Sequence, residues 1–585
     1  MIFPLLLALV IGGLAGGGAV FFRMLITCET RLFWGGDGDM AVLAVSHPWL
    51  VRLFIPFLAG IILGPFLARF IPEIMGPGVP AVMRALSLQD GIIRHRVTLA
   101  KSFVTATFIA AGASLGREGP IVQIGSSIGS SLTQLFRLGP DHRRLAVACG
   151  AAAGIAATFQ APMAGTLFAV EVLLFDLEVS SLSNIVIAAV TGTVVSRVFW
   201  DRETVFPVPF FSLSHPAELL LYLLLGVAAG FLSLLFMGAI FGVGRLLRRY
   251  HVPVWLGPAA GGLLTGLIGL LCPQALGVGY GTIQAALQNH IVWTGGLVLL
   301  LAKLATTSLC VGSGMSGGIF APSLFLGAML GAMIGSCASM IWPDCPVSPA
   351  HYALVGMGAV VAGTTLAPIT AILTIFELTY NYEIVLPLMA ACIPSIIVVR
   401  LLHGYSIYET RLLDQGIRIV RGHDVNRLRQ MKVREYLCDN MEILRKHTPF
   451  QDIVDQVLTS PFPHFVVLDE HDRLAGVLTL RDVRALLADP RQRSGRLTVG
   501  DLMKTPVVTV REDQSLAEAF ALFSKGNFSF LPVVAADDPG RVVGCLKKDT
   551  LITAYQQHVL REQVGPSPRW ICALPEDDPD RCGSS

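Results

Sequence analysis

The sequence is poor in charged residues. Asp, Glu, Lys and Arg make up 14% of its 585 residues, whereas hydrophobic residues make up 53%. A soluble globular domain carries about a quarter charged residues, so most of this chain is not ordinary soluble protein. The formal net charge is only +2, and nothing in this balance indicates a nucleic-acid partner.

Three motifs that would indicate metal sites, proteases or pumps are absent. The 11 cysteines form no C-x-x-C pair, and the sequence contains neither H-E-x-x-H nor a Walker A loop. The cysteines are therefore interpreted as small buried hydrophobic residues. The other two absences argue against an intramembrane metalloprotease and against ATP-driven pumping. We expect no enzymatic activity, no metal and no required cofactor.

What is present instead is a long apolar part. From residue 1 to about residue 400, apolar stretches such as "LFIPFLAGIILGPFLARF" are long enough, or nearly so, to cross about 30 Å of hydrocarbon. Several other apolar stretches are short or broken by Gly and Pro. Such interrupted segments are typical of transporters with discontinuous helices.

The apolar part contains an internal repeat. In each copy a proline is followed by glycines five and nine residues later; these landmarks are Pro120, Gly125 and Gly129 in the first copy and Pro322, Gly327 and Gly331 in the second. Further along, an Ala-Pro pair precedes Glu171 or Glu377, with ten residues from alanine to glutamate in both copies. This order predicts two structural repeats, which transporters often arrange in inverted orientation around a substrate site.

Each copy places a proline at a plausible first helical position, where its missing N–H costs nothing. A helix that begins inside a membrane leaves N–H donors unpaired beside the positive end of its dipole, and an anion can satisfy them. Glu118 lies just before Pro120, at the mouth of such a helix. Its carboxylate is either a movable gate or a helix charge that only satisfies the dipole. An ionisable group at membrane depth favours the gate.

Three motifs carry a family resemblance: GPGVP at 76–80, GREGP at 116–120 and GGIFAP at 317–322. Together with the repeat, they make residues 1–410 resemble the CLC family of chloride channels and proton-coupled chloride exchangers. The resemblance implies an all-α polytopic membrane domain built from two inverted repeats with discontinuous helices. It also implies a homodimer with a separate anion pathway in each subunit.

The resemblance assigns roles to particular residues. Glu118 matches the external gate, inside the helix N-terminus motif made by Gly116, Arg117, Gly119 and Pro120. The implied anion-binding residues are Gly76, Pro77, Gly78, Val79, Gly318, Ile319, Phe320 and Tyr408. Tyr408 is preferred to Tyr405 as the tyrosine after the last membrane helix, and an interfacial belt residue is the alternative interpretation.

Two positions depart from the family pattern. Pro77 replaces a serine whose hydroxyl donates to the anion, and family members with proline here prefer nitrate. The expected transported anion is therefore chloride or nitrate, unless the backbone accommodates the change with little effect. Val172 follows Glu171 where bacterial exchangers carry a second glutamate, the internal proton acceptor. Glu171, like Glu377, is interpreted as a buried helix-end or subunit-stabilising carboxylate.

Because valine cannot take a proton, we expect a passive chloride channel gated by Glu118. The alternative is a proton-coupled chloride or nitrate exchanger whose protons arrive by water. A CBS-linked magnesium channel and an intramembrane protease are distant alternatives, since the membrane part has few of the carboxylates that a magnesium pore needs.

The sequence from about Lys432 onward is soluble in character and repeats itself. Each copy has a short helix, a β segment, an amphipathic helix and two strands around a polar turn, which resembles a tandem pair of α/β CBS domains. Gly476, Thr479 and Asp482 match that family's ribose-binding pattern, whereas the second copy has Thr550 in place of the aspartate. Two interpretations of the pair therefore stay open: that it holds one adenine-nucleotide site, or that it is a purely structural module.

These expectations divide the chain into a transmembrane anion-transport domain at 1–410, a linker at 411–431, CBS domains at 432–491 and 497–561, and a disordered tail at 562–585. We expect a multi-pass protein of the cell (inner) membrane with its CBS domains in the cytoplasm. Its expected partners are the transported anion, protons in the exchanger alternative, and a second copy of the chain.

Overall fold

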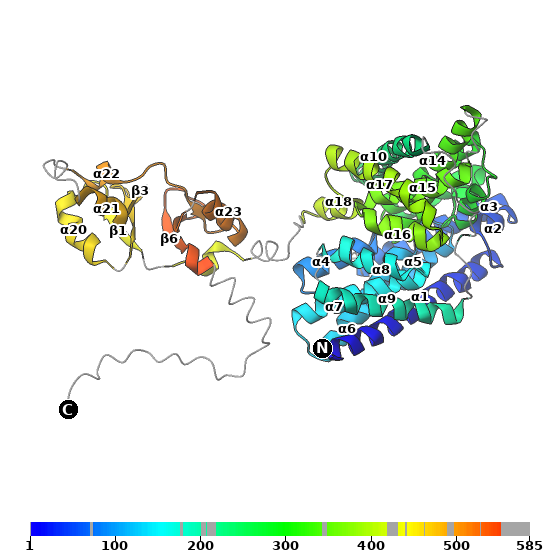
Figure 1. Cartoon of the computed structure of the whole chain (residues 1–585), viewed down its shortest axis with the longest axis horizontal. Helices are drawn as coiled ribbons and strands as arrows, with labels where there is room; N and C mark the ends of the chain where they lie inside the picture. The colour runs from blue at the N-terminus through cyan, green and yellow to red at the C-terminus, as the bar shows by residue number, and fades with distance from the viewer. Residues whose placement is uncertain are drawn as a thin grey trace. The chain divides into compact units, whose positions relative to one another are not determined.

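The computed structural model describes residues 2–70, 74–175, 179–200, 206, 218–341, 348–417, 431–438, 441–460, 462–487, 497–526 and 528–551. The chain forms two compact units, Met1–Ile419 and Val420–Ser585. The first unit is helical and the second holds the β-strands (Figure 1). The predicted tail at 562–585 and residues 418–430 of the predicted linker lie outside the described residues, so the domain boundaries stay predictions.

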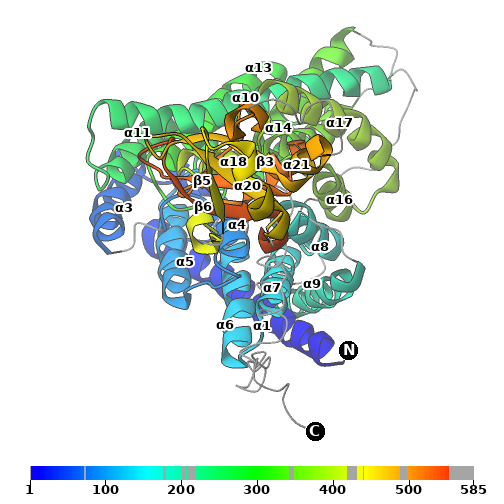
Figure 2. The ribbon, with the colours of Figure 1, turned by 90° about the vertical axis from the view of Figure 1, so that its left-hand side faces the viewer.

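The first unit is built from two successive sets of helices. The first set is α1 (Ile2–Trp34), α2 (Met40–Val45), α3 (Trp49–Phe70), α4 (Gly78–Leu88), α5 (His95–Ala110), α6 (Glu118–Leu135), α7 (Pro140–Phe159), α8 (Pro162–Phe168), the π-helix η2 (Ala169–Leu174) and α9 (Val179–Phe199). The second set is α10 (Glu218–Arg249), α11 (Gly257–Leu271), η3 (Pro273–Ala275), α12 (Tyr280–Leu287), α13 (Trp293–Gly312), α14 (Phe320–Ile341), α15 (Pro349–Thr365), α16 (Pro368–Thr379), η4 (Tyr382–Ile384), α17 (Val385–Leu402) and α18 (Ile407–Asp414). Within the sets, α1 lies beside α6, α7 and α9, and α10 lies beside α13 and α17 (Figure 2). α10 also contacts α15, and α11 of the second set packs on α3 of the first.

Seven of the described helices are long and apolar enough to cross a membrane, judged by length and composition. They include α1 and α10, and large apolar side chains such as Leu224 and Leu235 are exposed on α10. Other apolar helices, such as α4 and α11, are shorter, at 10–17 residues. The predicted all-α membrane domain with discontinuous helices is confirmed.

The predicted repeat is present in the backbone. Ala161 and Ala367 precede α8 and α16 with almost the same angles, φ −123° with ψ 82° and 80° respectively. The residues before them, Gln160 and Leu366, both adopt left-handed conformations, with φ of 53° and 54°. Two non-glycine residues rarely share this conformation at matching positions by chance, so the two copies have the same local structure.

The repeated glycines allow two pairs of helices to approach closely. α6 packs on α7, and α14 packs on α15. A Cβ added to Gly125 would lie well under 3.0 Å from the carbonyl oxygen of Gly150, and a Cβ added to Gly327 would clash in the same way with Gly356. Small residues are what let helix backbones meet at such short range, which explains the shared proline–glycine spacing.

A glutamate from each repeat caps a helix of the other. The Glu377 carboxylate of α16 accepts hydrogen bonds from two N–H groups in the first turn of α8, at 3.0 and 2.7 Å. The Glu171 carboxylate of η2 accepts from two N–H groups in the first turn of α16, at 3.3 and 2.8 Å, and from the Thr370 hydroxyl. Both carboxylates hold a helix end, as predicted, but only Glu377 is buried, and Glu171 is partly exposed. When each of two units caps a helix of the other in the same way, the units are related by a two-fold axis. Such an axis relates the two inverted repeats.

The second unit contains two sheets with the same topology. Its elements are η5 (Val433–Tyr436), β1 (Glu442–Arg445), α20 (Phe450–Thr459), β2 (His464–Leu468), β3 (Leu474–Thr479), α21 (Leu480–Leu487), α22 (Val499–Leu502), β4 (Val510–Arg511), α23 (Leu516–Gly526), β5 (Phe530–Val534) and β6 (Val542–Lys547). In each sheet the first two strands are parallel and the last two antiparallel. The His464 ring of one sheet stacks on Phe530 of the other at 4.9 Å. The predicted α/β pair is confirmed.

Candidate functional site

The GREGP and GGIFAP motifs meet at a backbone bridge. The Gly116 N–H donates to the Gly318 carbonyl, and the Gly318 N–H donates to the Gly116 carbonyl, both at 2.7 Å. Segments 202 residues apart in the sequence are therefore held side by side. The bridge pairs buried backbone groups just before α6 and α14 begin. Inside a membrane such groups must be hydrogen-bonded within the protein.

Buried hydroxyl groups hold this bridge from both sides. Thr105 of α5 pairs with Ser316 at 2.8 Å, and Ser114 pairs with Thr307 of α13 at 2.7 Å. All four side chains are fully buried. The first pair joins a helix of repeat one to the loop of repeat two, and the second pair does the reverse. This symmetric network fixes the position from which the two interrupted helices start.

The GPGVP motif also lies close to this bridge. A Cβ added to Gly119 would lie 3.1 Å from the Gly78 backbone nitrogen and 3.3 Å from the Gly318 Cα, and a Cβ on Gly78 would clash with the Gly119 carbonyl. α4 begins at Gly78, α6 at Glu118 and α14 at Phe320. The N-termini of these helices, with the positive ends of their dipoles, therefore converge.

Glu118 lies at this convergence and is 2% exposed. Its Oε1 accepts a hydrogen bond from the Tyr280 hydroxyl at 3.4 Å. Its Oε2 is buried against Gly116 and Gly318 and accepts no hydrogen bond of normal geometry from the described residues. The backbone N–H groups of Glu118 and Ala321 also face this carboxylate, so it occupies helix N-terminus donors that an anion would otherwise use.

Tyr280 was not predicted as part of the site. The Arg117 guanidinium lies 5.1 Å from the Tyr280 ring centroid, in a cation–π arrangement, and Phe206 packs on the ring edge-on at 5.6 Å. Tyr280 begins α12, far from GREGP in the sequence, so no local pattern pointed to it. These neighbours orient its hydroxyl toward Glu118.

A small cavity adjoins the carboxylate. It offers about 10 Å³ to the centre of a water-sized sphere, and this is about the space that one water needs. The predicted residues that line it are Pro77, Val79, Glu118, Gly119, Gly318, Ile319, Phe320 and Tyr408, and two lining residues that were not predicted are Ile155 and Phe168. The remaining predicted residues do not line the cavity: Gly76, Gly78, Gly116, Arg117 and Pro120.

α18 supplies the tyrosine of this cavity. Tyr408 is 2% exposed and lines the cavity wall, whereas Tyr405 stays outside it, against the ring of His403. The helix start is held by a capping box, in which Ser406 and Glu409 satisfy each other's backbone N–H. The capping box positions Tyr408 beside the anion motifs, and its predicted role as an anion ligand stays a prediction.

Of the two departures from the family pattern, Pro77 lines the central cavity and Val172 does not. Pro77 is the N-cap residue of α4, with no side-chain cap hydrogen bond, and it lines the cavity. As a proline it offers neither a hydroxyl nor an N–H donor to an anion there. Val172 is 3% exposed on η2, next to Glu171.

Two buried lysines support the site without having been predicted. Lys101 of α5 donates to the Gly76 carbonyl at 3.1 Å, and Lys303 of α13 donates to the Gly277 carbonyl at 2.6 Å. They are 1% and 0% exposed. They are separated by 202 residues, as are the two repeat prolines, so extending the repeat comparison to charged residues would have found them. Each anchors the loop that precedes α4 or α12.

The three candidate nucleotide residues of the second unit lie together. The Asp482 carboxylate in the first turn of α21 accepts from the N–H and hydroxyl of Thr479, and it pairs with Lys504 at 2.6 Å. Gly476 on β3 packs against Met503. Burial alone would raise the pKa of the Asp482 carboxyl, but the Lys504 ammonium and Thr479 outweigh burial and lower this pKa. The carboxylate is therefore charged at neutral pH.

Comparisons with known proteins agree with this architecture. The family described as voltage gated chloride channel matches residues 59–400, and the CBS domain matches residues 433–489 and 499–557. A putative chloride channel protein ClcB-like of Ralstonia nicotianae is 36% identical over 412 residues, covering 69% of this chain and 96% of the relative. An H(+)/Cl(−) exchange transporter ClcA of Vibrio parahaemolyticus is 34% identical over 424 residues, covering 70% of this chain and 89% of the relative.

Solved structures give the same result. A slow cyanobacterial Cl−/H+ antiporter aligns with a TM-score of 0.64 and 26% identity, covering 71% of this chain and 97% of that one. A eukaryotic CLC transporter aligns with a TM-score of 0.62 over 94% of this chain and 97% of that one. Its identity is 20%, so it shows the fold alone.

These findings overturn the prediction of a passive chloride channel. Relatives from Vibrio parahaemolyticus and Cronobacter sakazakii are named exchange transporters, and the cyanobacterial neighbour is an antiporter. The prediction gave too much weight to Val172. One missing carboxylate does not prevent proton transfer, because water chains also carry protons. The relatives from Vibrio parahaemolyticus and Cronobacter sakazakii are named transporters rather than enzymes. This chain belongs to the CLC family of voltage gated chloride channels and exchangers, with a C-terminal pair of CBS domains.

Proposed function

We propose that this protein exchanges chloride for protons across a membrane, with Glu118 as both gate and proton acceptor. One observation carries the proposal: a buried carboxylate adjoins a cavity for one water-sized body where three helix N-termini converge. Relatives named H(+)/Cl(−) exchange transporters support it.

Chloride and the Glu118 carboxylate compete for the same positive surroundings. While Glu118 is ionised, its charge complements the helix N-termini and excludes a second anion from so small a space. Protonation removes that charge, so the neutral side chain leaves and chloride takes the place beside residues 318–320 and the Tyr408 hydroxyl. When Glu118 returns as a carboxylate, its proton is released on the opposite side and the anion is expelled. One group thus couples the two movements.

The proton route in this proposal uses no carboxylate at position 172. Val172 is buried and apolar, so in this proposal protons reach Glu118 along water rather than through a side chain at position 172. Glu171 does not serve as a carrier, because both of its oxygens hold the first turn of α16. Its replacement would disturb the fold before it disturbed proton transfer.

The anion preference follows from Pro77. A serine at this position would add a hydroxyl donor and an N–H donor that hydrogen-bond a compact anion, and proline has neither. We infer that chloride is favoured over nitrate less strongly here than in relatives with serine. Nitrate is then a second substrate of the same pathway.

The proposal includes a homodimer in the cell (inner) membrane. On α9 and α17, large apolar side chains recur every four residues and are 41–79% exposed: Val186, Val190, Val194, Ile393, Ile397 and Leu401. Two such stripes need lipid or a second subunit to cover them. The basic end of α10, with Arg248 and Arg249, supports a cytoplasmic location for that side of the unit and for the CBS pair.

The CBS pair is proposed to bind one adenine nucleotide that regulates transport. In this proposal the Asp482 carboxylate accepts from ribose hydroxyls, and Lys504, which pairs with it at 2.6 Å, contacts a phosphate. Titration of ATP and AMP into the full-length protein by calorimetry tests this site. Binding that is lost in Asp482→Asn supports it, and equal binding by both proteins contradicts it.

Coupled flux is tested with the purified protein in lipid vesicles. An outward chloride gradient should drive protons inward against their own gradient, and Glu118→Gln should abolish the proton movement while chloride still flows. Chloride flux without proton movement in the wild-type protein would contradict exchange. Proton movement that persists in Glu118→Gln would contradict the role of this residue.

A further inference from the structure

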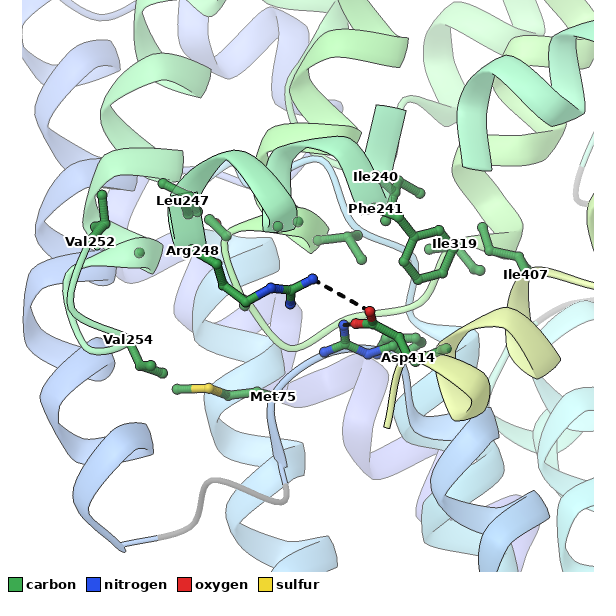
Figure 3. A pocket seen from close by; sticks show the side chains of 18 of the residues that line it. Met75, Ile240, Phe241, Leu247, Arg248, Val252, Val254, Ile319, Ile407 and Asp414 are labelled. Carbon is green, nitrogen blue, oxygen red and sulfur yellow. Dashed lines mark hydrogen bonds and ion pairs between the residues drawn. The ribbon is translucent and has the colours of Figure 1, made fainter. Parts of the chain in front are cut away.

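A second cavity, of about 190 Å³, lies beside the central one. We call it the vestibule. Its walls are mainly apolar, with Ile240 and Leu247 from α10 and Val254 from the following segment (Figure 3). The Arg248 side chain on its rim is 60% exposed, so the vestibule reaches the surface of the unit. Among the described residues, its charged lining consists of Arg248, Arg411 and Asp414.

The vestibule is continuous with the candidate anion site. Pro77 and Ile319 line both cavities and form the wall between them. α18 contributes to both as well: Tyr408 lines the central cavity, and Arg411, three residues later and thus on the same helix face, lines the vestibule. An anion that passes Pro77 therefore enters the space beside Arg411.

Arg411 lies where Pro77 has removed hydrogen-bond donors. Its guanidinium packs against Gly76, so that a Cβ built on this glycine would be 3.2 Å from Nη2 and 3.5 Å from Nε. Gly76 has a left-handed φ of +86°, and Lys101 holds its carbonyl. Lys101 and Arg411 thus both lie against the loop at Gly76 that precedes α4. Because both side chains are cationic, the surroundings of the start of α4 are positively charged.

The vestibule cations are only partly neutralised. Asp414 accepts from Arg248 at 3.4 Å and lies 3.7 Å from Arg411 (Figure 3). Two arginines and one aspartate leave a net charge of +1. The Asp414 carboxylate occupies the position that a diffusible anion would take between the two guanidinium groups.

We propose that Arg411 and Arg248 form an anion-binding site in the vestibule, and that Asp414 is its built-in competitor. The ligand is the transported monovalent anion, so the inference rests on the proposed function and adds a site to its pathway. Anions reach Pro77 by displacing Asp414 from the guanidinium groups. Arg411 thereby compensates for the donors that Pro77 lacks.

The test uses the full-length protein in vesicles and measures chloride flux as a function of chloride concentration. Arg411→Gln should raise the KM for chloride about fivefold, the effect expected for one partly exposed charge pair. Arg411→Lys should keep KM within about twofold of wild type, since the charge remains. Asp414→Asn should lower KM by about two- to fivefold, because the competitor is gone. Arg249→Gln, an exposed charge on α10 outside the vestibule, is the matched control and should leave KM unchanged.

Opposite shifts of KM in Arg411→Gln and Asp414→Asn support the site, because a purely structural role would impair both variants. Equal KM values in all variants, or a rise in both, would overturn it. The proton-to-chloride ratio is recorded in the same vesicles. If wild type moves no protons, the proposed exchange fails while the comparison of KM values still decides the vestibule site. Should Arg411→Gln not fold, Asp414→Asn and Arg411→Lys decide it alone.

Discussion

Replacement of Glu377 by glutamine tests the exchanged caps that join the two repeats. The Glu377 carboxylate is 7% exposed and accepts two backbone hydrogen bonds from α8. Hydrogen bonds to a charged group contribute about 1.5–3 kcal/mol each, and neutral ones about 1 kcal/mol. Glutamine has one acceptor oxygen for two donors and no charge. After allowing for the cost of burying a carboxylate, we expect Glu377→Gln to lower the free energy of unfolding by about 2–4 kcal/mol.

The measurement is reversible unfolding of the protein in mixed micelles. Glu383→Gln, on the exposed 3-10 helix η4, is the matched control and should change stability by less than about 0.5 kcal/mol. Glu171→Gln should resemble Glu377→Gln, because it removes the equivalent cap from α16. If Glu377→Gln is as stable as the Glu383→Gln control, the reasoning that the caps hold the repeats together is wrong.

Three further predictions concern the pathway and the helix contacts. Pro77→Ser should raise the chloride-to-nitrate flux ratio about three- to tenfold, since it restores donors; an unchanged ratio in vesicle uptake would refute this. Tyr280→Phe removes a donor to the gate carboxylate and should raise chloride turnover at neutral pH about two- to fivefold, whereas the exposed Tyr382→Phe should not; equal turnover would count against the contact. Gly327→Leu should abolish recovery of monodisperse protein because its Cβ would clash with α15, while Gly238→Leu, with open space around it, should be tolerated; similar yields would contradict the tight α14–α15 contact.

The repeat and the main site motifs could be predicted from the sequence because their chemistry is local. Pro120 and Pro322 mark helix starts, and the glycines after them mark close helix contacts, so equal spacing translates into equal structure. The position of Glu118 just before Pro120 placed it at a helix mouth for the same reason.

The rest of the site depends on contacts between distant segments. Tyr280 reaches Glu118 from another helix, and Lys101 reaches a carbonyl in the loop before α4. Arg411 and Asp414 read as ordinary surface charges in the sequence, and only the fold places them beside Pro77. The channel prediction failed for a related reason. The identity of residue 172 shows that one side chain cannot carry a proton, but it does not show where water lies.

Bromide binding seen by anomalous X-ray diffraction tests most directly whether an anion and the Glu118 carboxylate compete for one site. In crystals of Glu118→Gln soaked in bromide, an anomalous peak should lie within hydrogen-bonding reach of the backbone at residues 318–320 and of the Tyr408 hydroxyl. At neutral pH the wild-type protein should show a weaker peak in the part of the cavity that adjoins the Glu118 carboxylate. No bromide in this cavity, or equal peaks in both proteins, would contradict the competition.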